Sequence, residues 1–295
     1  MQAPRVELKK TRDFGEIVND TFVFIRQNFR ALVRVFFMYC GIFVVAGMIS
    51  MIFQQIKAVQ YYNDIITKKD SPGVFDSFSQ FGLEYIGALL SMWFTYTLMT
   101  VSTIAFIGLY VEKGRVVPGN EELWLRVKNT FTATLGASVI WFILLAIGSL
   151  MCVIPGIYLF PVCSLFYVVL VIEQSSFGEA WNKSFRLIKN NWWTTFGVLF
   201  IMYLVAYFST TVITLPATII NMIGLFSKGK PELSLTFTIL ATVLQYLCQV
   251  FLILPVIASC LSYYSLSEGK DGVGLMERIS QFSDKTAHDE RPESY

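Results

Sequence analysis

The sequence predicts an all-α integral membrane protein with six transmembrane helices and three amphipathic helices at the cytoplasmic membrane surface. Composition gives the first indication. Of the 295 residues, 55% are hydrophobic and only 15% are charged, whereas about 25% of the residues in a soluble domain are charged. Long uncharged blocks account for this deficit, which is typical of membrane spans. Because the net charge is only +2, we predict no nucleic-acid partner.

A repeated segment gives the second indication. Residues 13–29, DFGEIVNDTFVFIRQNF, return 163 positions later as residues 176–192, SFGEAWNKSFRLIKNNW. In both copies apolar residues follow helical spacing, and a long apolar run comes directly afterwards. We therefore expect each copy to form a helix in the plane of the membrane surface, with its apolar face inward. Residues 121–134 form a weaker third segment of the same kind.

The starts of these helices carry capping residues. Asp13 is a natural N-cap and Glu16 follows at the third helical position, while Ser176 and Glu179 form an S-x-x-E capping box. Either glutamate could instead bind a partner or a lipid amine. We favour capping, because it satisfies backbone N–H groups that the first helical turn leaves unpaired.

Six apolar runs follow in order. A Pro155-Gly156 hairpin is expected to join the third span to the fourth, which is short and interrupted by Pro161. Residues 1–12 are predicted to be a loose polar tail, and residues 269–295 a flexible cytoplasmic tail. Between them, residues 13–268 form a single membrane domain with spans at about 31–53, 82–110, 135–153, 157–172, 194–223 and 235–264.

The chain divides into three similar units, each an amphipathic helix followed by two spans and a glutamate. These units are residues 13–112, 119–173 and 176–268, and they close on Glu112, Glu173 and Glu268. The three acids are interpreted as ordinary residues at helix ends. The alternative is a cytoplasmic-face ring that coordinates a cation or an amine substrate. Because the middle unit is shorter and matches weakly, the sequence leaves open whether it is a true repeat.

Lysine and arginine counts predict the orientation. Eighteen of the 23 Lys and Arg residues lie in the two terminal segments and in residues 111–134 and 173–193. The loops on the other side hold only five. The positive-inside rule then places both termini and all three amphipathic segments in the cytoplasm.

Several polar and aromatic residues are candidates for contacts within or at the edge of the membrane. We expect the amides and hydroxyls of the spans to bond between helices, and the alternative is that they line a polar cavity. Tryptophans near the amphipathic segments are expected to anchor the chain at headgroup level. The polar candidates are Thr100, Thr103, Asn221, Gln245 and Gln249, and the anchors are Trp181, Trp192 and Trp193.

No motif for catalysis is found, so no catalytic, cofactor-binding or metal-ligating residue is predicted, and no cofactor is expected. The single histidine, His288, lies in the C-terminal tail. No charged residue lies near the middle of a predicted span, where ion-coupled transporters usually keep one. This disfavours a proton-driven transporter.

One stretch resembles a known family. The run FGEAWNKSFRLIKNNWWTTFG, preceded by IPGIYLFP and by a span ending in VIE, is similar to bacterial multi-span membrane proteins related to the membrane domain of glycerophosphodiester phosphodiesterases and to similar domains of unknown function. The specific part covers residues 155–197. The resemblance implies a multi-pass protein of the bacterial inner membrane. It transfers no catalytic residue, because the catalytic barrel of the fused enzymes is absent from this chain.

Three functions remain open. The leading hypothesis is a non-enzymatic membrane protein that acts as a scaffold or subunit of a membrane assembly, with the bilayer and other proteins as partners. The second is a transporter or flippase-like protein for a lipid or small amphiphile, with a cavity lined by Thr100, Thr103, Gln245 and Gln249. The third is a membrane-embedded enzyme acting on lipid through the three closing glutamates. A bound lipid is compatible with each.

Overall fold

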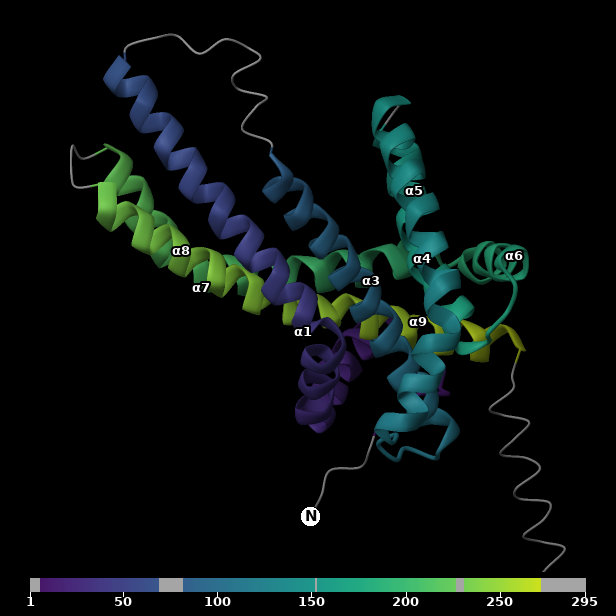
Figure 1. Cartoon of the computed structure of the whole chain (residues 1–295). Helices are drawn as coiled ribbons and strands as arrows, with labels where there is room; N and C mark the ends of the chain where they lie inside the picture. The colour runs from purple at the N-terminus through teal and green to yellow at the C-terminus, as the bar shows by residue number, and fades with distance from the viewer. Residues whose placement is uncertain (1–5, 69–81, 152, 227–230, 272–295) are drawn as a thin grey trace, which may run out of the picture. The chain divides into compact units, whose positions relative to one another are not determined.

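A computed structural model describes residues 6–68, 82–151, 153–226 and 231–271. Within these ranges the chain is helical, with connecting turns and no strand (Figure 1). Five helical stretches are long and apolar enough to cross a membrane, and residues Gly156–Ile172 form a shorter apolar helix. The structure therefore supports an all-α membrane protein with five long candidate spans.

The helices are α1 (Phe14–Lys68), α3 (Leu83–Glu112), α4 (Asn120–Met151), α5 (Val153–Ile172), α6 (Phe177–Ile188), α7 (Trp192–Phe226), α8 (Pro231–Leu247), the 3₁₀ segment η1 (Cys248–Leu252) and α9 (Ile253–Asp271). The 3₁₀ segment has a local cause. Pro255 has no N–H, and its ring clashes with the carbonyl four residues earlier, at Phe251. The chain adopts the tighter winding directly before the proline.

Only one of the three predicted amphipathic helices is a separate helix. The first continues into the following span within α1, and the second does so within α4. Neither junction contains proline or a left-handed residue. The third, α6, ends before Asn190, whose φ of 73° stops the helix. Asparagine tolerates this conformation better than most residues. The first two predicted amphipathic helices are therefore continuous with the apolar helices that follow them.

Two further predictions differ from the structure. α5 begins at Val153, so Pro155 and Gly156 lie in its first turn and do not form a hairpin. Proline is tolerated there, because the N–H groups of a first turn have no helical partner. The predicted N-terminal tail is ordered from Val6 onward, and Val6 and Leu8 are buried.

The backbone divides into two compact units. Unit 1 contains residues 1–28, 104–202 and 255–295, and unit 2 contains residues 29–103 and 203–254. The chain passes between them within α1, α3, α7 and α9. The first boundary, between Asn28 and Phe29, lies where the first amphipathic segment was predicted to end.

Unit 2 is a bundle of apolar helices with a few polar contacts. Phe43 and Phe94 stack between α1 and α3 at 5.1 Å. The hydroxyls of Tyr96 and Tyr203 share a hydrogen bond of 3.0 Å between α3 and α7. Thr242 of α8 donates to the side chain of Gln55 of α1 at 3.0 Å. These contacts join all four helices of the unit.

In unit 1 the three amphipathic segments bury the same positions. Each helix begins directly after Asp13, Gly119 or Ser176, and we count positions from that preceding residue. The fourth, eighth and eleventh positions are buried in all three segments. The fourth position holds Ile17, Leu123 and Ala180, the eighth holds Thr21, Val127 and Ser184, and the eleventh holds Phe24, Thr130 and Leu187. The middle segment therefore packs in the register of the other two, although its sequence matches weakly.

Gly47 provides a test of unit 2 packing. A Cβ added there would lie 2.8 Å from the Tyr246 ring and 3.0 Å from Ser91 Cβ. We expect Gly47→Val to lower the free energy of unfolding by about 1–3 kcal/mol, the usual cost of overpacking. Gly41→Val is the matched control, because its Cβ would meet nothing within 4 Å. Thermal unfolding in detergent measures both variants, and equal unfolding midpoints would contradict the predicted close approach.

Candidate functional site

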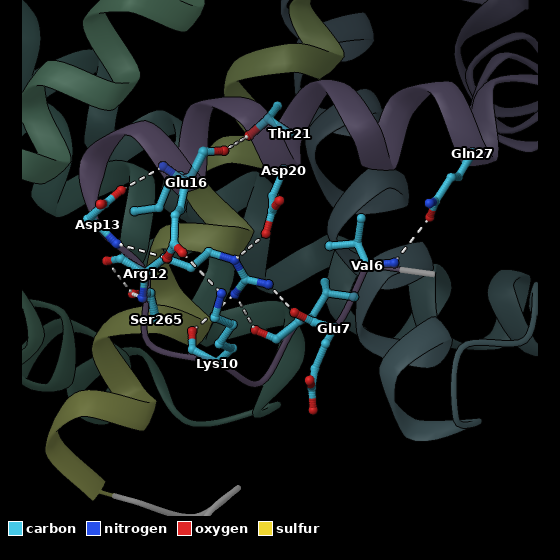
Figure 2. Close-up of polar contacts among 12 residues, drawn as sticks. Val6, Glu7, Lys10, Arg12, Asp13, Glu16, Asp20, Thr21, Gln27 and Ser265 are labelled. Atoms are coloured by element: carbon cyan, nitrogen blue, oxygen red, sulfur yellow. Dashed lines mark hydrogen bonds and ion pairs between the residues drawn. The ribbon is translucent and has the colours of Figure 1, made fainter. Parts of the chain in front are cut away.

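Unit 1 is held together by ion pairs between each amphipathic segment and the chain that precedes it. The first pair joins Arg12 Nε to Asp20 Oδ2 at 2.8 Å (Figure 2). The Arg12 side chain is fully buried. Its remaining guanidinium donors reach the backbone carbonyls of Glu7, Leu8 and Lys10. Burial of this charge is therefore compensated by one carboxylate and three carbonyls, as a buried cation requires.

The Arg12 backbone also fastens α9 to the N-terminal segment. Its N–H donates to Ser265 Oγ at 2.8 Å, and the Ser265 hydroxyl lies 3.2 Å from the Arg12 carbonyl (Figure 2). Val6 N–H donates to the Gln27 side chain at 3.2 Å. These contacts explain why residues 6–12 are ordered where the sequence predicted a loose tail.

The second pair joins Glu112, at the end of α3, to Arg126 of α4. Arg126 Nη2 lies 2.6 and 2.7 Å from the two carboxylate oxygens. Nη1 donates to the Ile172 carbonyl at 3.3 Å. With its amide oxygen facing the guanidinium, Gln174 accepts from Nη1 and Nε at 2.9 and 3.0 Å. One arginine thus connects the ends of α3 and α5 to the start of α4.

The third pair joins Glu173, just after α5, to Lys183 of α6. Lys183 Nζ lies 2.6 Å from Glu173 Oε1, and each side chain is 25% exposed. The Tyr263 hydroxyl of α9 donates to the same carboxylate oxygen. Aromatic contacts support this arrangement, because Phe166 of α5 packs against Phe177 and Trp181 of α6 at 4.9 and 5.8 Å.

The three pairs occupy equivalent positions. Asp20, Arg126 and Lys183 are each the seventh residue after the helix-preceding position. The partners lie one, seven and three residues before the helix-preceding position, and the first pair has the two charges exchanged. Helical periodicity does not reveal this pattern. The one regular signal in the sequence is a charged residue seven positions after each helix-preceding residue, because the spacing to its partner varies.

The three closing glutamates line one pocket of about 290 Å³ in unit 1. Glu112, Glu173 and Glu268 were predicted to recur at equivalent points of the units, and the structure brings them together. Two lysines, Lys9 and Lys183, also line the pocket. The carboxylates therefore do not form a purely acidic ring, since Glu112 and Glu173 are already paired with basic side chains.

Chemically, the pocket offers charges of both signs and aromatic hydroxyls. Tyr263, Tyr264 and Ser267 of α9 contribute hydroxyls to its lining. In the described part of the chain, no group of three or more His, Cys, Asp or Glu side chains is arranged to hold a metal ion. The arrangement can bind a polar group, and nothing in its geometry marks one carboxylate as a general acid or base.

The capping residues lie at the helix starts. Glu16 N–H donates to Asp13 Oδ1 at 2.7 Å, and Asp13 N–H lies 3.4 Å from Glu16 Oε2 (Figure 2). Ser176 and Glu179 form a capping box, with Ser176 N–H donating to Glu179 Oε2 at 3.1 Å. Hydrogen bonds from the Ser176 side chain and backbone lower the pKa of Glu179. Both glutamates are engaged at helix starts and do not line the pocket.

The predicted intramembrane polar residues that the structure describes have different surroundings. Thr100 and Thr103 are buried, and the Thr100 hydroxyl donates to the Tyr96 carbonyl within α3 at 2.8 Å. Gln245 is exposed on α8, whereas Gln249 lies in the 3₁₀ segment with its Oε1 buried and without a hydrogen-bond partner in the described residues. Because the chain changes from α-helix to 3₁₀-helix between Gln245 and Gln249, the two side chains do not share one helix face. The Asn221 side chain lies outside the described part of the structure.

The three tryptophans have different environments. Trp181 packs on α5, and Trp192 stacks on Tyr158 with its indole N–H donating to the Tyr158 carbonyl at 3.1 Å. Trp193 is 79% exposed. Only Trp193 therefore has the open exposure expected of a headgroup anchor, while the other two also hold helices together.

The fold and the site define a membrane-type helical protein with a pocket of mixed charge where apolar helices end. No protein-family model matches the chain, and neither the curated proteins nor the solved structures contain a match. The resemblance carried by residues 155–197 therefore stays a sequence-based prediction.

Replacing Arg12 tests the buried pair. We expect Arg12→Met to lower the free energy of unfolding by about 3 kcal/mol, because Asp20 and three carbonyls lose their shared donor. Lys10→Met is the control, since the Lys10–Glu16 pair is nearly half exposed and such pairs contribute about 1 kcal/mol or less. Chemical denaturation in mild detergent compares the two. Equal losses would show that Arg12 does not organise the segment.

A charge exchange tests the second pair. Glu112→Arg and Arg126→Glu should each lower the unfolding midpoint, because like charges then face each other. The double exchange should recover only part of the loss. A glutamate at position 126 cannot donate hydrogen bonds to the Ile172 carbonyl and Gln174, as Arg126 does. The coupling energy from this double-mutant cycle is expected to be about 1 kcal/mol. Strictly additive effects would contradict the pairing.

Proposed function

We propose that the chain is a six-span protein of the bacterial inner membrane, with both termini on the cytoplasmic side. Five long candidate spans and the shorter apolar helix Gly156–Ile172 supply the six crossings. The excess of Lys and Arg in the terminal and amphipathic segments supports the orientation. The final residues of α3, α5 and α9 then lie at the cytoplasmic ends of their spans.

We also propose that the three similar sequence segments, residues 13–112, 119–173 and 176–268, are true repeats. Two observations in unit 1 support this proposal. The amphipathic segments bury the same positions, and the seventh position carries an ion pair in each of them. The middle unit shares both features. Equivalent positions in a repeated sequence are expected to repeat their contacts, as in other proteins built from internal repeats.

The proposed role is that of a non-enzymatic scaffold or subunit in a membrane assembly. The observation that carries it is the exposed apolar surface at the start of α4, beside the ion-paired helix ends. Val116, Val117, Trp124 and Leu125 are each more than half exposed. A rigid base that presents exposed aromatic and aliphatic side chains suits a docking surface.

Co-purification tests the scaffold role. Protein isolated from native membranes in mild detergent should carry a partner in fixed stoichiometry. Leu125→Lys should release that partner and leave the unfolding midpoint within a degree or two of wild type, since exposed substitutions cost little. Glu121→Lys is the matched control, because Glu121 is also exposed on α4 and is not apolar. A partner-free wild-type monomer would contradict the proposal.

Cysteine labelling tests the orientation. In a background without native cysteines, Glu121→Cys should react with a membrane-impermeant reagent only after the cytoplasmic side is opened. Gln60→Cys should react from the opposite side. Both positions are exposed in the structure. The same sidedness for both cysteines would overturn the proposed topology.

A second function, handling of a lipid or small amphiphile, is favoured by one observation. The pocket of unit 1 lies where α3, α5 and α9 reach their final residues, and it is lined by charged and aromatic side chains. In the proposed orientation this is the level of the cytoplasmic headgroups.

A further inference from the structure

The pocket of unit 1 has the position of a headgroup site. Three apolar helices end around it, at Glu112, Ile172 and close to Glu268. The first and last of these belong to long candidate spans. Its volume of about 290 Å³ is at the lower limit of roughly 300–1,000 Å³ for small-molecule sites. The pocket can therefore accept the polar head of a lipid, while the acyl chains remain outside.

The charges around the pocket select against a ligand with a net charge. The lining carries three carboxylates and two ammonium groups, and Arg126 adds a third cation through its pair with Glu112. Formal charge therefore sums to zero. A net charge brought into this partly desolvated site would stay uncompensated. A ligand that carries one positive and one negative group can meet both kinds of side chain without changing the balance.

One hydroxyl of the lining is open to a ligand. Tyr264 is only 8% exposed and lines the pocket. Its phenol is close enough to Glu112, Glu173 and Arg126 to interact with them electrostatically, yet no described residue forms a hydrogen bond with its hydroxyl. The hydroxyl therefore has a hydrogen bond to offer to a partner inside the pocket. An acceptor oxygen of a bound ligand, such as a phosphate oxygen, supplies one.

The positive group of the ligand is a primary ammonium. The side chains that can receive it are carboxylates, which accept hydrogen bonds from N–H donors. A trimethylammonium group has no such donors and is bound by the faces of several aromatic rings. The pocket lining contains three carboxylates and two aromatic rings, those of Tyr263 and Tyr264, so it favours a group that donates hydrogen bonds.

We propose that this pocket binds the zwitterionic phosphoethanolamine headgroup of a phospholipid, with its ammonium facing the glutamates and its phosphate accepting from Tyr264. The inference rests on the proposed membrane placement of unit 1 and is independent of the scaffold role. Ligand binding is measured on the purified chain alone, so its failure is separate from failure of co-purification.

Native mass spectrometry of the full chain in nanodiscs tests the proposal. The discs contain phosphatidylglycerol with either phosphatidylethanolamine or phosphatidylcholine. We expect the protein to retain phosphatidylethanolamine at least about tenfold more tightly than either other lipid. Tyr264→Phe, which removes only the hydroxyl, should weaken retention about tenfold, the usual effect of losing a hydrogen bond to a charged group. Tyr207→Phe is the matched control, because Tyr207 is 72% exposed in unit 2.

Competition identifies the recognised part of the lipid. Soluble phosphoethanolamine should displace the bound lipid, whereas inorganic phosphate at the same concentration should not. Val111→Phe, which adds bulk at the pocket wall, should abolish retention, and unchanged thermal unfolding in lipid-free detergent shows that it folds. Equal retention of all three lipids, wild-type retention by either pocket variant, or displacement by phosphate alone would each overturn the proposal.

Discussion

The structure of unit 1 depends on one recurring interaction, an ion pair between the seventh position of each amphipathic segment and the chain just before that segment. The pairs Arg12–Asp20, Glu112–Arg126 and Glu173–Lys183 are all between 2.6 and 2.8 Å. Each ties an amphipathic segment to the chain that precedes it. Because the partners of Arg126 and Lys183 lie at the ends of α3 and α5, the same pairs also determine where these apolar helices end relative to one another.

The pocket is a consequence of this arrangement. Two of its three glutamates are members of the recurring pairs, and Tyr263 joins α9 to one of them. An isolated carboxylate in a partly buried site would be costly, and pairing removes most of that cost. The remaining polar capacity, above all the Tyr264 hydroxyl, is then open to a ligand. Structural pairing and ligand binding are thus compatible in one small volume.

Sequence reasoning predicted the helical class and the approximate positions of the long apolar helices, because long apolar runs and amphipathic periodicity are strong local patterns. It also selected Glu112, Glu173 and Glu268 from their equivalent places in the units. It did not predict Arg12, whose partners include Ser265, 253 residues away. Nor could it predict that the first two amphipathic segments continue into spans, since nothing in helical periodicity distinguishes a surface helix from the first turns of a longer one.

Hydrogen–deuterium exchange is the most direct test of the recurring ion pair. Asp20→Asn, Arg126→Gln and Lys183→Gln each remove one charge from one segment. The account predicts faster exchange in residues 14–28, 120–134 or 177–188 respectively, with the helices of unit 2 unchanged. Unaltered protection in all three variants, or faster exchange spread evenly over both units, would contradict the claim that these pairs organise unit 1.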